Sequence, residues 1–305
     1  MQNIVECVMN ISEGRDRIKL EAIADEIQAI ESSFLLHFCS DPDHHRTVFS
    51  FIGTPFSIGH AAFAATTKAI ELIDLTQHRG VHPRIGAVDV IPFVPVQGVS
   101  MEQCVQIANR VAEKIGRELG IPVYLYGEAA THPAFEHLAR IRNGEFEKFG
   151  EHLEKAPSRK PDFGPTRVDP TVGGIAVGAR QPLIAFNVYL ESLDVDIARQ
   201  IATSIRESGG GLAGVKALGF FIAHRNRAQV SMNVMNYRQT PLLKIFSRIC
   251  REARRLEIEV DSSEIVGLVP LDALEENSVK ALQLKGFDPD QILENSIKRA
   301  LEDSR

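Results

Sequence analysis

The sequence predicts an α/β protein, of the α+β kind, built from two ferredoxin-like βαββαβ subdomains. Three observations support this class. The chain has 305 residues, enough for two domains that each bury a core. Strand-like and helix-like segments alternate in both halves, and the least periodic stretch, residues 144–172, lies between them. We therefore predict subdomains of residues 1–178 and 179–305.

Apolar periodicity defines the elements of the first half, because alternation is typical of strands and a spacing of three and four is typical of helices. The predicted strands are residues 3–8, 34–38, 47–52, 88–96 and 123–126. The predicted helices are a charged one carrying Ile18, Ile23 and Ile27, followed by residues 55–74 and 101–119. Residues 144–172 then carry Pro157, Pro161, Pro165 and Pro170 and are interpreted as a linker or a substrate-contacting loop.

The second half repeats this pattern. Its predicted strands are residues 183–190, 215–222, 229–233 and 257–260. Its predicted helices are one capped by Asp194, one capped by Thr240 with Pro241 at its first position, and a terminal one after Asp288 and Pro289. Both halves approximate strand, helix, strand, strand, helix, strand, the ferredoxin-like order in which helices cover one face of an antiparallel sheet. The alternative is a generic α/β layer.

Composition argues against several classes of function. The formal net charge is −6 and the Lys and Arg residues are scattered, so we expect no nucleic-acid partner. No run of eighteen apolar residues and no standard secretion signal occurs, so we expect no membrane association. The four cysteines are far apart and form no C-x-x-C pair, which is typical of a protein of the reducing cytoplasm.

The densest chemical segment is residues 78–86, with two imidazoles and two guanidiniums at the passage from a helix to a strand. His78 or His82 could exchange protons near neutral pH, and Arg79 or Arg84 could hold a carboxylate with two hydrogen bonds. The alternative is a basic helix end followed by a solvent-exposed turn.

A second polar cluster extends from His37 to Arg46 and includes Cys39, His44 and His45. With His78 and His82 it could form a metal site, but the spacing contains no H-x-x-x-H or H-x-H pair, so we expect no metal. A polar turn with one or two ligand contacts is the alternative that we favour. The turn at residues 12–16 is either ligand-facing or a loop and helix cap.

A known family is recognisable in a long ordered series of segments. They are Val5-Glu6-Cys7-Val8, Asn10, Ser12-Glu13-Gly14, Arg46-Thr47-Val48, His78-Arg79-Gly80, His82-Pro83-Arg84-Ile85-Gly86-Ala87, Asp89-Val90, Pro92-Phe93-Val94-Pro95-Val96, Gly120-Ile121-Pro122-Val123-Tyr124-Leu125-Tyr126, Pro161-Asp162-Phe163-Gly164-Pro165, Val177-Gly178-Ala179-Arg180, Leu183-Ile184-Ala185-Phe186-Asn187, Gln229-Val230-Ser231 and Ile265-Val266-Gly267-Leu268-Val269-Pro270-Leu271. From end to end, the chain resembles the glutamate formimidoyltransferase family, meaning the transferase part of formimidoyltransferase-cyclodeaminase and its stand-alone bacterial forms. The cyclodeaminase part is not expected in 305 residues.

The resemblance implies a homodimer, a ligand groove between the two subdomains, and transfer of a formimino or formyl group between N-substituted L-glutamate and N5 of tetrahydrofolate. Tetrahydrofolate is then a co-substrate, and no tightly bound cofactor is expected. His82 matches the family's catalytic histidine. The expected folate-binding residues are Phe163, Gly164, Pro165, Thr166, Pro170, Thr171, Val172 and Gly178. Arg46, Arg79 and Arg84 are the nearest candidates to bind the carboxylates of glutamate, with Cys39 beside them.

Several positions depart from the family pattern. Val81 stands where a Glu usually precedes the catalytic histidine, His45 stands where Asn is usual, and His37 and Cys39 replace Asp residues of the site strand. Loss of an anion near His82 would lower its basicity. Two alternatives therefore stay open: a folate-binding paralogue with another one-carbon donor or no turnover, and a metal-dependent amide hydrolase.

Overall fold

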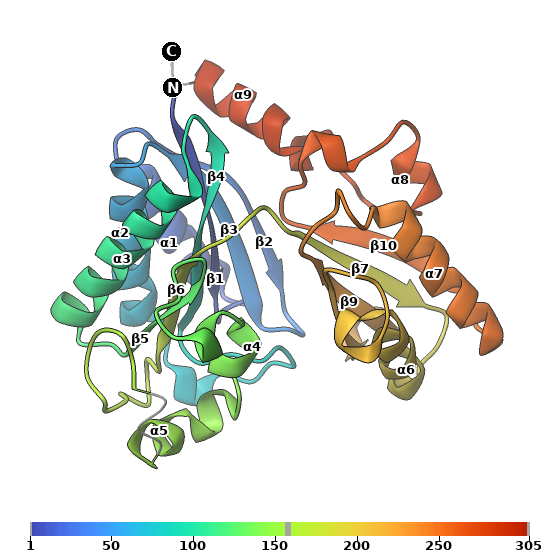
Figure 1. Ribbon diagram of the computed structural model, residues 1–305, viewed down its shortest axis with the longest axis horizontal. Helices are drawn as coiled ribbons and strands as arrows, with labels where there is room; N and C mark the ends of the chain where they lie inside the picture. The colour runs from blue at the N-terminus through green and yellow to red at the C-terminus, as the bar shows by residue number, and fades with distance from the viewer. Residues whose placement is uncertain (1, 156–159, 304–305) are drawn as a thin grey trace. The chain divides into compact units, whose positions relative to one another are not determined.

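The computed structural model describes residues 2–155 and 160–303, and the chain forms two compact units that meet between Gln181 and Pro182 (Figure 1). This division lies three residues beyond the predicted boundary after Gly178. The predicted boundary would cut β6 (Ile175–Ala179), which belongs entirely to the first sheet. Pro157, in the stretch interpreted as a linker, lies outside the described residues. The predicted mixed α/β class, with one sheet in each unit, is confirmed.

The first unit has a six-stranded sheet of order β2-β3-β1-β4-β6-β5. Its strands are β1 (Ile4–Ile11), β2 (Ser33–Asp41), β3 (Arg46–Gly53), β4 (Val88–Gln97), β5 (Val123–Gly127) and β6. The pairs β2–β3, β1–β3 and β1–β4 are antiparallel, whereas β4–β6 and β5–β6 are parallel. The antiparallel arrangement predicted for this half is therefore wrong for the strand at residues 123–126, which pairs in parallel with β6.

Three helices cover one face of this sheet: α1 (Arg17–Gln28), α2 (Ser57–Leu72) and α3 (Met101–Lys114), the last continued by a π-helical turn, Ile115–Leu119 (Figure 1). Asp16 caps α1, and Ser100 with Gln103 forms a capping box on α3. Their apolar residues pack against the side of β1 that carries Cys7 and Met9. The predicted stripe of α1 needs one correction, since Ile18 is 80% exposed and the buried stripe begins at Leu20.

The other face of β4, β5 and β6 is covered by α4 (Leu138–Ile141) and α5 (Glu145–Lys155). Residues 144–172 were predicted to be irregular, and α5 contradicts this for the first part of the stretch. Phe149 and Leu153, one helical turn apart, are buried against Tyr124. Strand β6 was not predicted, because a parallel strand buried on both faces shows no polar alternation.

The second unit follows the predicted order of strands and helices: β7 (Ile184–Leu190), α6 (Val195–Ile205), β8 (Val215–Ile222), β9 (Arg227–Val234), α7 (Leu242–Arg255) and β10 (Val260–Val266). These strands form an antiparallel sheet of order β10-β7-β9-β8, and α6 and α7 pack on one face of it (Figure 1). The last strand overlaps the predicted residues 257–260 only at Val260 and extends beyond them to Val266. Two further helices, α8 (Ser278–Ala281) and α9 (Leu293–Asp303), complete the described chain.

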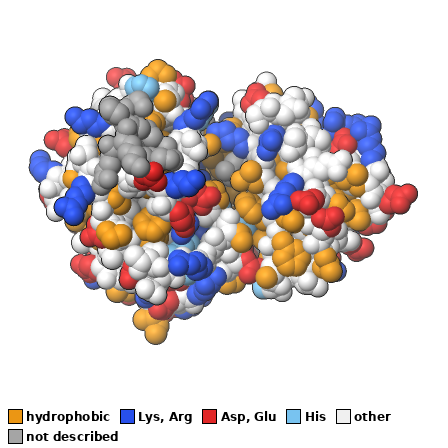
Figure 2. Space-filling view, turned by 90° about the horizontal axis from the view of Figure 1, so that it is seen from below, with side chains coloured by type: hydrophobic (Ala, Val, Ile, Leu, Met, Phe, Trp, Pro, Cys, Tyr) orange, Lys and Arg blue, Asp and Glu red, His pale blue; other side chains and the backbone are white. Residues whose placement is uncertain are grey.

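No helix in the described ranges combines the length and apolar character that a membrane crossing requires. Lys and Arg side chains alternate with Asp and Glu over the face seen in Figure 2. The charge on that face is therefore mixed.

Candidate functional site

The polar segments singled out in the sequence meet at one end of the first sheet. Asp41, at the end of β2, pairs with Arg46, at the start of β3, so residues 42–45 form a tight turn there. The segment after β1 reaches the same end, since Ser12 N donates to Ala87 O at 2.8 Å and Ser12 Oγ to Gly86 O at 2.7 Å. The loop that carries His82 is therefore attached to the β1 end just before β4 begins.

Glu13 fixes the segment after β1. One carboxylate oxygen, Oε1, accepts hydrogen bonds from the backbone N–H groups of Gly14, Arg15 and Asp16 and from Nε2 of His45 at 3.1 Å. Burial raises the pKa of Glu13, but these hydrogen bonds outweigh it and lower the pKa to about 2. Because Asp16 also caps α1, residues 12–16 are the loop and helix cap of the second sequence interpretation.

His45 connects this segment to the 78–86 loop. Its Nδ1 donates to the carbonyl oxygen of Arg79 at 3.0 Å, and its own carbonyl oxygen accepts from Nε2 of His78 at 2.7 Å. The two imidazole rings stack with centroids 4.2 Å apart. Burial lowers the pKa of His78 to about 4, so this histidine is neutral. A Cβ on Gly80 would lie 2.4 Å from His44 O, so only glycine allows the loop to approach so closely.

His82 is half-buried, and Nη1 of Arg46 lies near both of its ring nitrogens, 3.3 Å from Nδ1 and closer to Nε2. Nδ1 lies 2.8 Å from the carbonyl oxygen of Pro83, which can only accept a hydrogen bond, so Nδ1 carries the proton. Nε2 lies 2.5 Å from Nη1 of Arg46, which can only donate. Burial lowers the pKa of His82 well below its ordinary value, and the positive charges of Arg46 and Arg142 lower it further. The geometry therefore describes a neutral histidine whose basic nitrogen faces a guanidinium.

Arg142 and Asp89 complete the surroundings of His82. Arg142 follows α4 and forms an ion pair with Asp89, a carboxylate that is 1% exposed and also accepts from Ile85 N at 3.0 Å. Burial lowers the pKa of Arg46 to about 10, with Arg142 as the next cause. Sequence reasoning missed Arg142 because its segment carries no motif, and the helix before it is only four residues long.

Cys39 and Arg46 share one face of the sheet. Cys39 lies opposite Val48, Val48 opposite Asn10 and Asn10 opposite Val90, so these side chains project from the face that α4 and α5 partly cover. Arg46, two residues before Val48, projects from the same face, and Cys39 is close enough to it to influence its pKa. The structure thus brings His82, Arg46 and Cys39 together.

The other two predicted arginines are engaged elsewhere. Arg84 is buried, with its guanidinium 2.9 Å from Glu147 and 3.7 Å from Glu145 in α5. Arg79 is exposed and donates to the carbonyl oxygen of His78 at 2.7 Å. Any carboxylate that bound Arg84 would have to compete with Glu147.

The segment predicted to bind folate attaches to the first unit at two places. Phe163 pairs with Val123 at the start of β5. Further along, Thr171 O accepts from Leu75 N and Val172 O accepts from Ala87 N, both at 2.8 Å, so this part adjoins the loop that carries His82. The exposed residues of the segment include Gly164, Pro165, Thr166, Pro170 and Thr171.

Gly178 is separate from this segment. It is buried in β6, about 10 Å along the strand from Ile175, the first residue of β6. A Cβ at this position would lie 2.3 Å from Tyr126 O. Close packing of two strands therefore accounts for this glycine.

Comparison with known proteins identifies the family of this chain. Residues 4–180 match the model of the formiminotransferase domain, N-terminal subdomain, and residues 185–291 match that of the formiminotransferase domain. The chain belongs to the formiminotransferase family. Its resemblance to that family, recognised in the sequence, is thereby confirmed. The two matches are separated at residues 181–184, next to the junction of the compact units.

Two curated relatives cover nearly the whole chain. The glutamate formimidoyltransferase of Streptococcus pyogenes serotype M1 is 44% identical over 298 residues, which is 97% of this chain and 99% of the relative. That of Thermoplasma acidophilum is 45% identical over 301 residues, 98% of each chain. The formimidoyltransferase-cyclodeaminase of Sus scrofa is 42% identical over 280 residues, which is 90% of this chain and 51% of the relative.

Two other features bear on the alternatives. Among residues 2–155 and 160–303, no three His, Cys, Asp or Glu side chains lie together as metal ligands would, so no observation favours the metal-dependent hydrolase.

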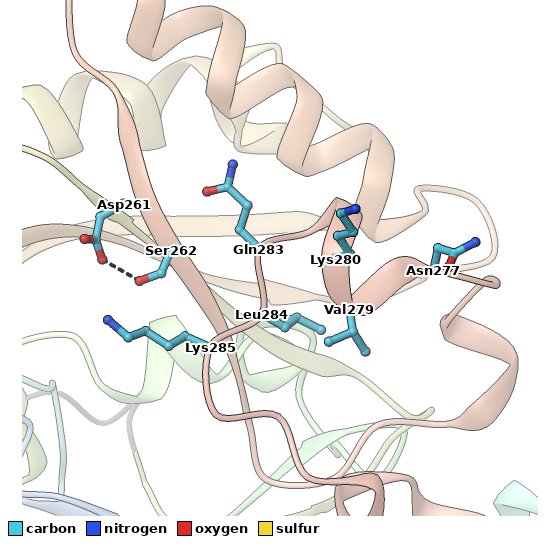
Figure 3. A pocket seen from close by; sticks show the side chains of 8 residues that line it. All are labelled: Asp261, Ser262, Asn277, Val279, Lys280, Gln283, Leu284 and Lys285. Carbon is cyan, nitrogen blue, oxygen red and sulfur yellow. Dashed lines mark hydrogen bonds between the residues drawn. The ribbon is translucent and has the colours of Figure 1, made fainter.

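A surface depression of about 600 Å³ lies in the second unit beside β10 and α8 (Figure 3). It is lined by Asp261, Ser262, Asn277, Val279, Lys280, Gln283, Leu284 and Lys285. None of the predicted site residues of this formiminotransferase chain lines it.

Proposed function

We propose that the protein transfers the formimino group of N-formimino-L-glutamate to N5 of tetrahydrofolate and releases L-glutamate. Membership of the formiminotransferase family and 44% identity to a glutamate formimidoyltransferase along almost the full chain support the reaction class. The observation that carries the mechanism is the neutral His82, whose basic Nε2 lies among residues able to bind a carboxylate.

The reaction requires two proton movements. N5 of the folate attacks the amidine carbon, a new carbon–nitrogen bond forms, and N5 loses its proton. The bond from that carbon to the glutamate nitrogen then breaks, and this nitrogen leaves as an amine after it has gained a proton. Because the protonated amidine itself accepts the electron pair during attack, the substrates supply the electrophile.

His82 suits both proton movements. Its Nε2 lone pair can take the proton from N5, and the resulting imidazolium can return a proton to the departing nitrogen. Such acid–base catalysis contributes about 10²- to 10⁴-fold in typical enzymes. Arg46 beside it would bind a glutamate carboxylate through two parallel hydrogen bonds.

Tetrahydrofolate is placed in this proposal along the segment from Phe163 to Val172. The attachment of Thr171 and Val172 to the His82 loop supports the placement, because a ligand on this segment would lie near the catalytic ring. The proposal includes Gly178 on the sheet face, a homodimer, a cytoplasmic location and the absence of a tightly bound cofactor. These points derive from the family resemblance and the composition.

A turnover assay tests the proposal. Purified protein would be supplied with tetrahydrofolate and either N-formimino-L-glutamate or N-formyl-L-glutamate, and release of L-glutamate would be measured. We expect release with the formimino donor, and none when either substrate is omitted. Folate binding in calorimetry without release of L-glutamate from either donor would contradict the proposal. That outcome would favour a divergent folate-binding paralogue, in agreement with the presence of Cys39 where the family usually has Asp.

A further inference from the structure

The contact between Arg46 and His82 has a chemical cost for the proposed reaction. Nε2 is the only ring nitrogen that can accept a proton, because Nδ1 already donates to Pro83 O. In this structure the Nε2 lone pair accepts a hydrogen bond from Arg46 at 2.5 Å. A base in that arrangement cannot take a proton from the folate until Arg46 has moved.

Two guanidiniums lie in the same place, and the two carboxylates near them, Asp41 and Asp89, already accept hydrogen bonds from other groups. Arg46, from β3, and Arg142, from the end of α4, both lie near His82, and His44, in the β2–β3 turn, faces its ring at a centroid distance of 5.9 Å. Asp89 binds Arg142 and Ile85 N, and Asp41 binds the backbone N–H groups of Asp43 and His44. Nε of Arg142 is buried and has no hydrogen-bond partner. Arg142 is close enough to Arg46 to lower its pKa, and a carboxylate is the ligand that such a pair of guanidiniums would bind.

We propose that a carboxylate of the glutamate substrate binds Arg46 and Arg142 together and, by drawing Arg46 away from Nε2 of His82, makes that nitrogen available as a base. This inference rests on the proposed function and adds two roles to it. Arg142 becomes a substrate-binding residue, and Arg46 becomes a positioning residue that couples binding to catalysis. Without a bound carboxylate, the histidine is kept neutral and covered, so the base is generated only when the donor substrate is present.

The coupling predicts a change in the titration of His82 that is independent of turnover. Binding brings a negative charge to the two guanidiniums and removes the donor from Nε2, and both changes favour the imidazolium. The pKa of His82 therefore rises when the carboxylate binds. A shift of one pH unit corresponds to a tenfold change in the protonation equilibrium.

The experiment follows the Cε1–H resonance of His82 by NMR in full-length protein labelled at histidine, with the His82→Gln variant to assign the signal. We expect saturating L-glutamate to raise the titration midpoint by at least about one pH unit. Glutaramide, which has no carboxylate, should leave the midpoint unchanged. Arg46→Gln should raise the midpoint without ligand, and Arg142→Gln should abolish the response to L-glutamate. Arg140→Gln, an equal loss of charge at an exposed position of α4, should retain that response.

Turnover gives a second readout for Arg142. Arg142→Gln should raise KM for the formimino donor about ten- to a hundredfold, because a charged hydrogen bond to substrate is lost, while kcat falls much less. L-glutamate that binds in calorimetry but leaves the His82 midpoint unmoved would overturn the coupling alone. Protein that binds no L-glutamate would overturn the proposed donor site and the coupling with it. An unmoved midpoint in a folded Arg46→Gln variant would also contradict the coupling.

Discussion

Glu13 is expected to stabilise the loops of the site through its charge, and Glu13→Gln tests this directly. Glutamine keeps the shape and a neutral oxygen acceptor, so the substitution removes the negative charge and little else. The pKa of Glu13 is about 2 in the folded protein against an ordinary value of 4.5. This difference corresponds to roughly 3 kcal/mol at neutral pH. Solvent screening requires little discount, because Glu13 is only 6% exposed.

The pH dependence of this stabilisation has a defined sign. Because the pKa of Glu13 is depressed on folding, its contribution is fully present above the unfolded pKa of 4.5 and is lost as the pH falls towards about 2. The linkage relation leaves a little less than half of it at about pH 3. The difference in stability between the original protein and Glu13→Gln should therefore shrink as the solution becomes acidic.

Urea unfolding followed by circular dichroism measures both effects. We expect Glu13→Gln to lose about 3 kcal/mol at pH 7 and about half of that at pH 3. Glu21→Gln is the matched control, since Glu21 forms an exposed ion pair with Arg17 at 2.8 Å, and such pairs contribute about 0.5 kcal/mol or less. A loss below about 1 kcal/mol at pH 7, or a loss that does not change with pH, would refute the reasoning.

Three further substitutions have distinct expected outcomes. His82→Ala should lower kcat by roughly two to four decades with little change in folate affinity, and normal turnover of this variant would remove the catalytic assignment. Gly164→Ala should lower Tm more than Gly210→Ala. Both glycines have positive φ, 82° and 80°, but of the two only Gly164 would bring its new Cβ against a backbone atom, at 2.0 Å. Equal losses of Tm would contradict this account. Cys39→Asp should speed formimino transfer by about five- to thirtyfold if a missing acid limits the rate, and a folded variant that is no faster would reject that explanation.

The sequence predicted the elements whose packing leaves a periodic pattern. Helices α3 and α7 each bury one stripe of apolar residues, and β7 and β9 are the inner strands of an antiparallel sheet, so residue spacing identified them. The parallel strand β6 is buried along its whole length and has no alternation to detect. Helix α5 was missed because its charged residues and the prolines that follow obscured the pair Phe149 and Leu153.

The residues of the site also differ in whether a local sequence pattern reveals them. His82 and Arg46 were found because each lies in a short polar motif, and Arg84 was chosen with them because it is adjacent in sequence. Adjacency misled for Arg84, whose guanidinium turns to Glu147. Arg142 has no motif and influences the pKa of His82 because α4 packs over the sheet, a tertiary arrangement that residue spacing does not reveal. The folate-binding assignments, which derive from the resemblance, stay predictions.

Cys39 bears on the hydrogen bond by which Arg46 covers the basic nitrogen of His82. Cys39 lies near Arg46, and Arg46 donates to Nε2 of His82. An aspartate at position 39 would offer Arg46 a permanent carboxylate partner, so it would compete with His82 for the guanidinium even without substrate. In Cys39→Asp the titration midpoint of His82 should therefore rise in the unliganded protein, and L-glutamate should raise it further by less than in the original chain. An unchanged midpoint in a well-folded variant would mean that the thiol only packs against the strand and that Arg46 alone sets the state of the base.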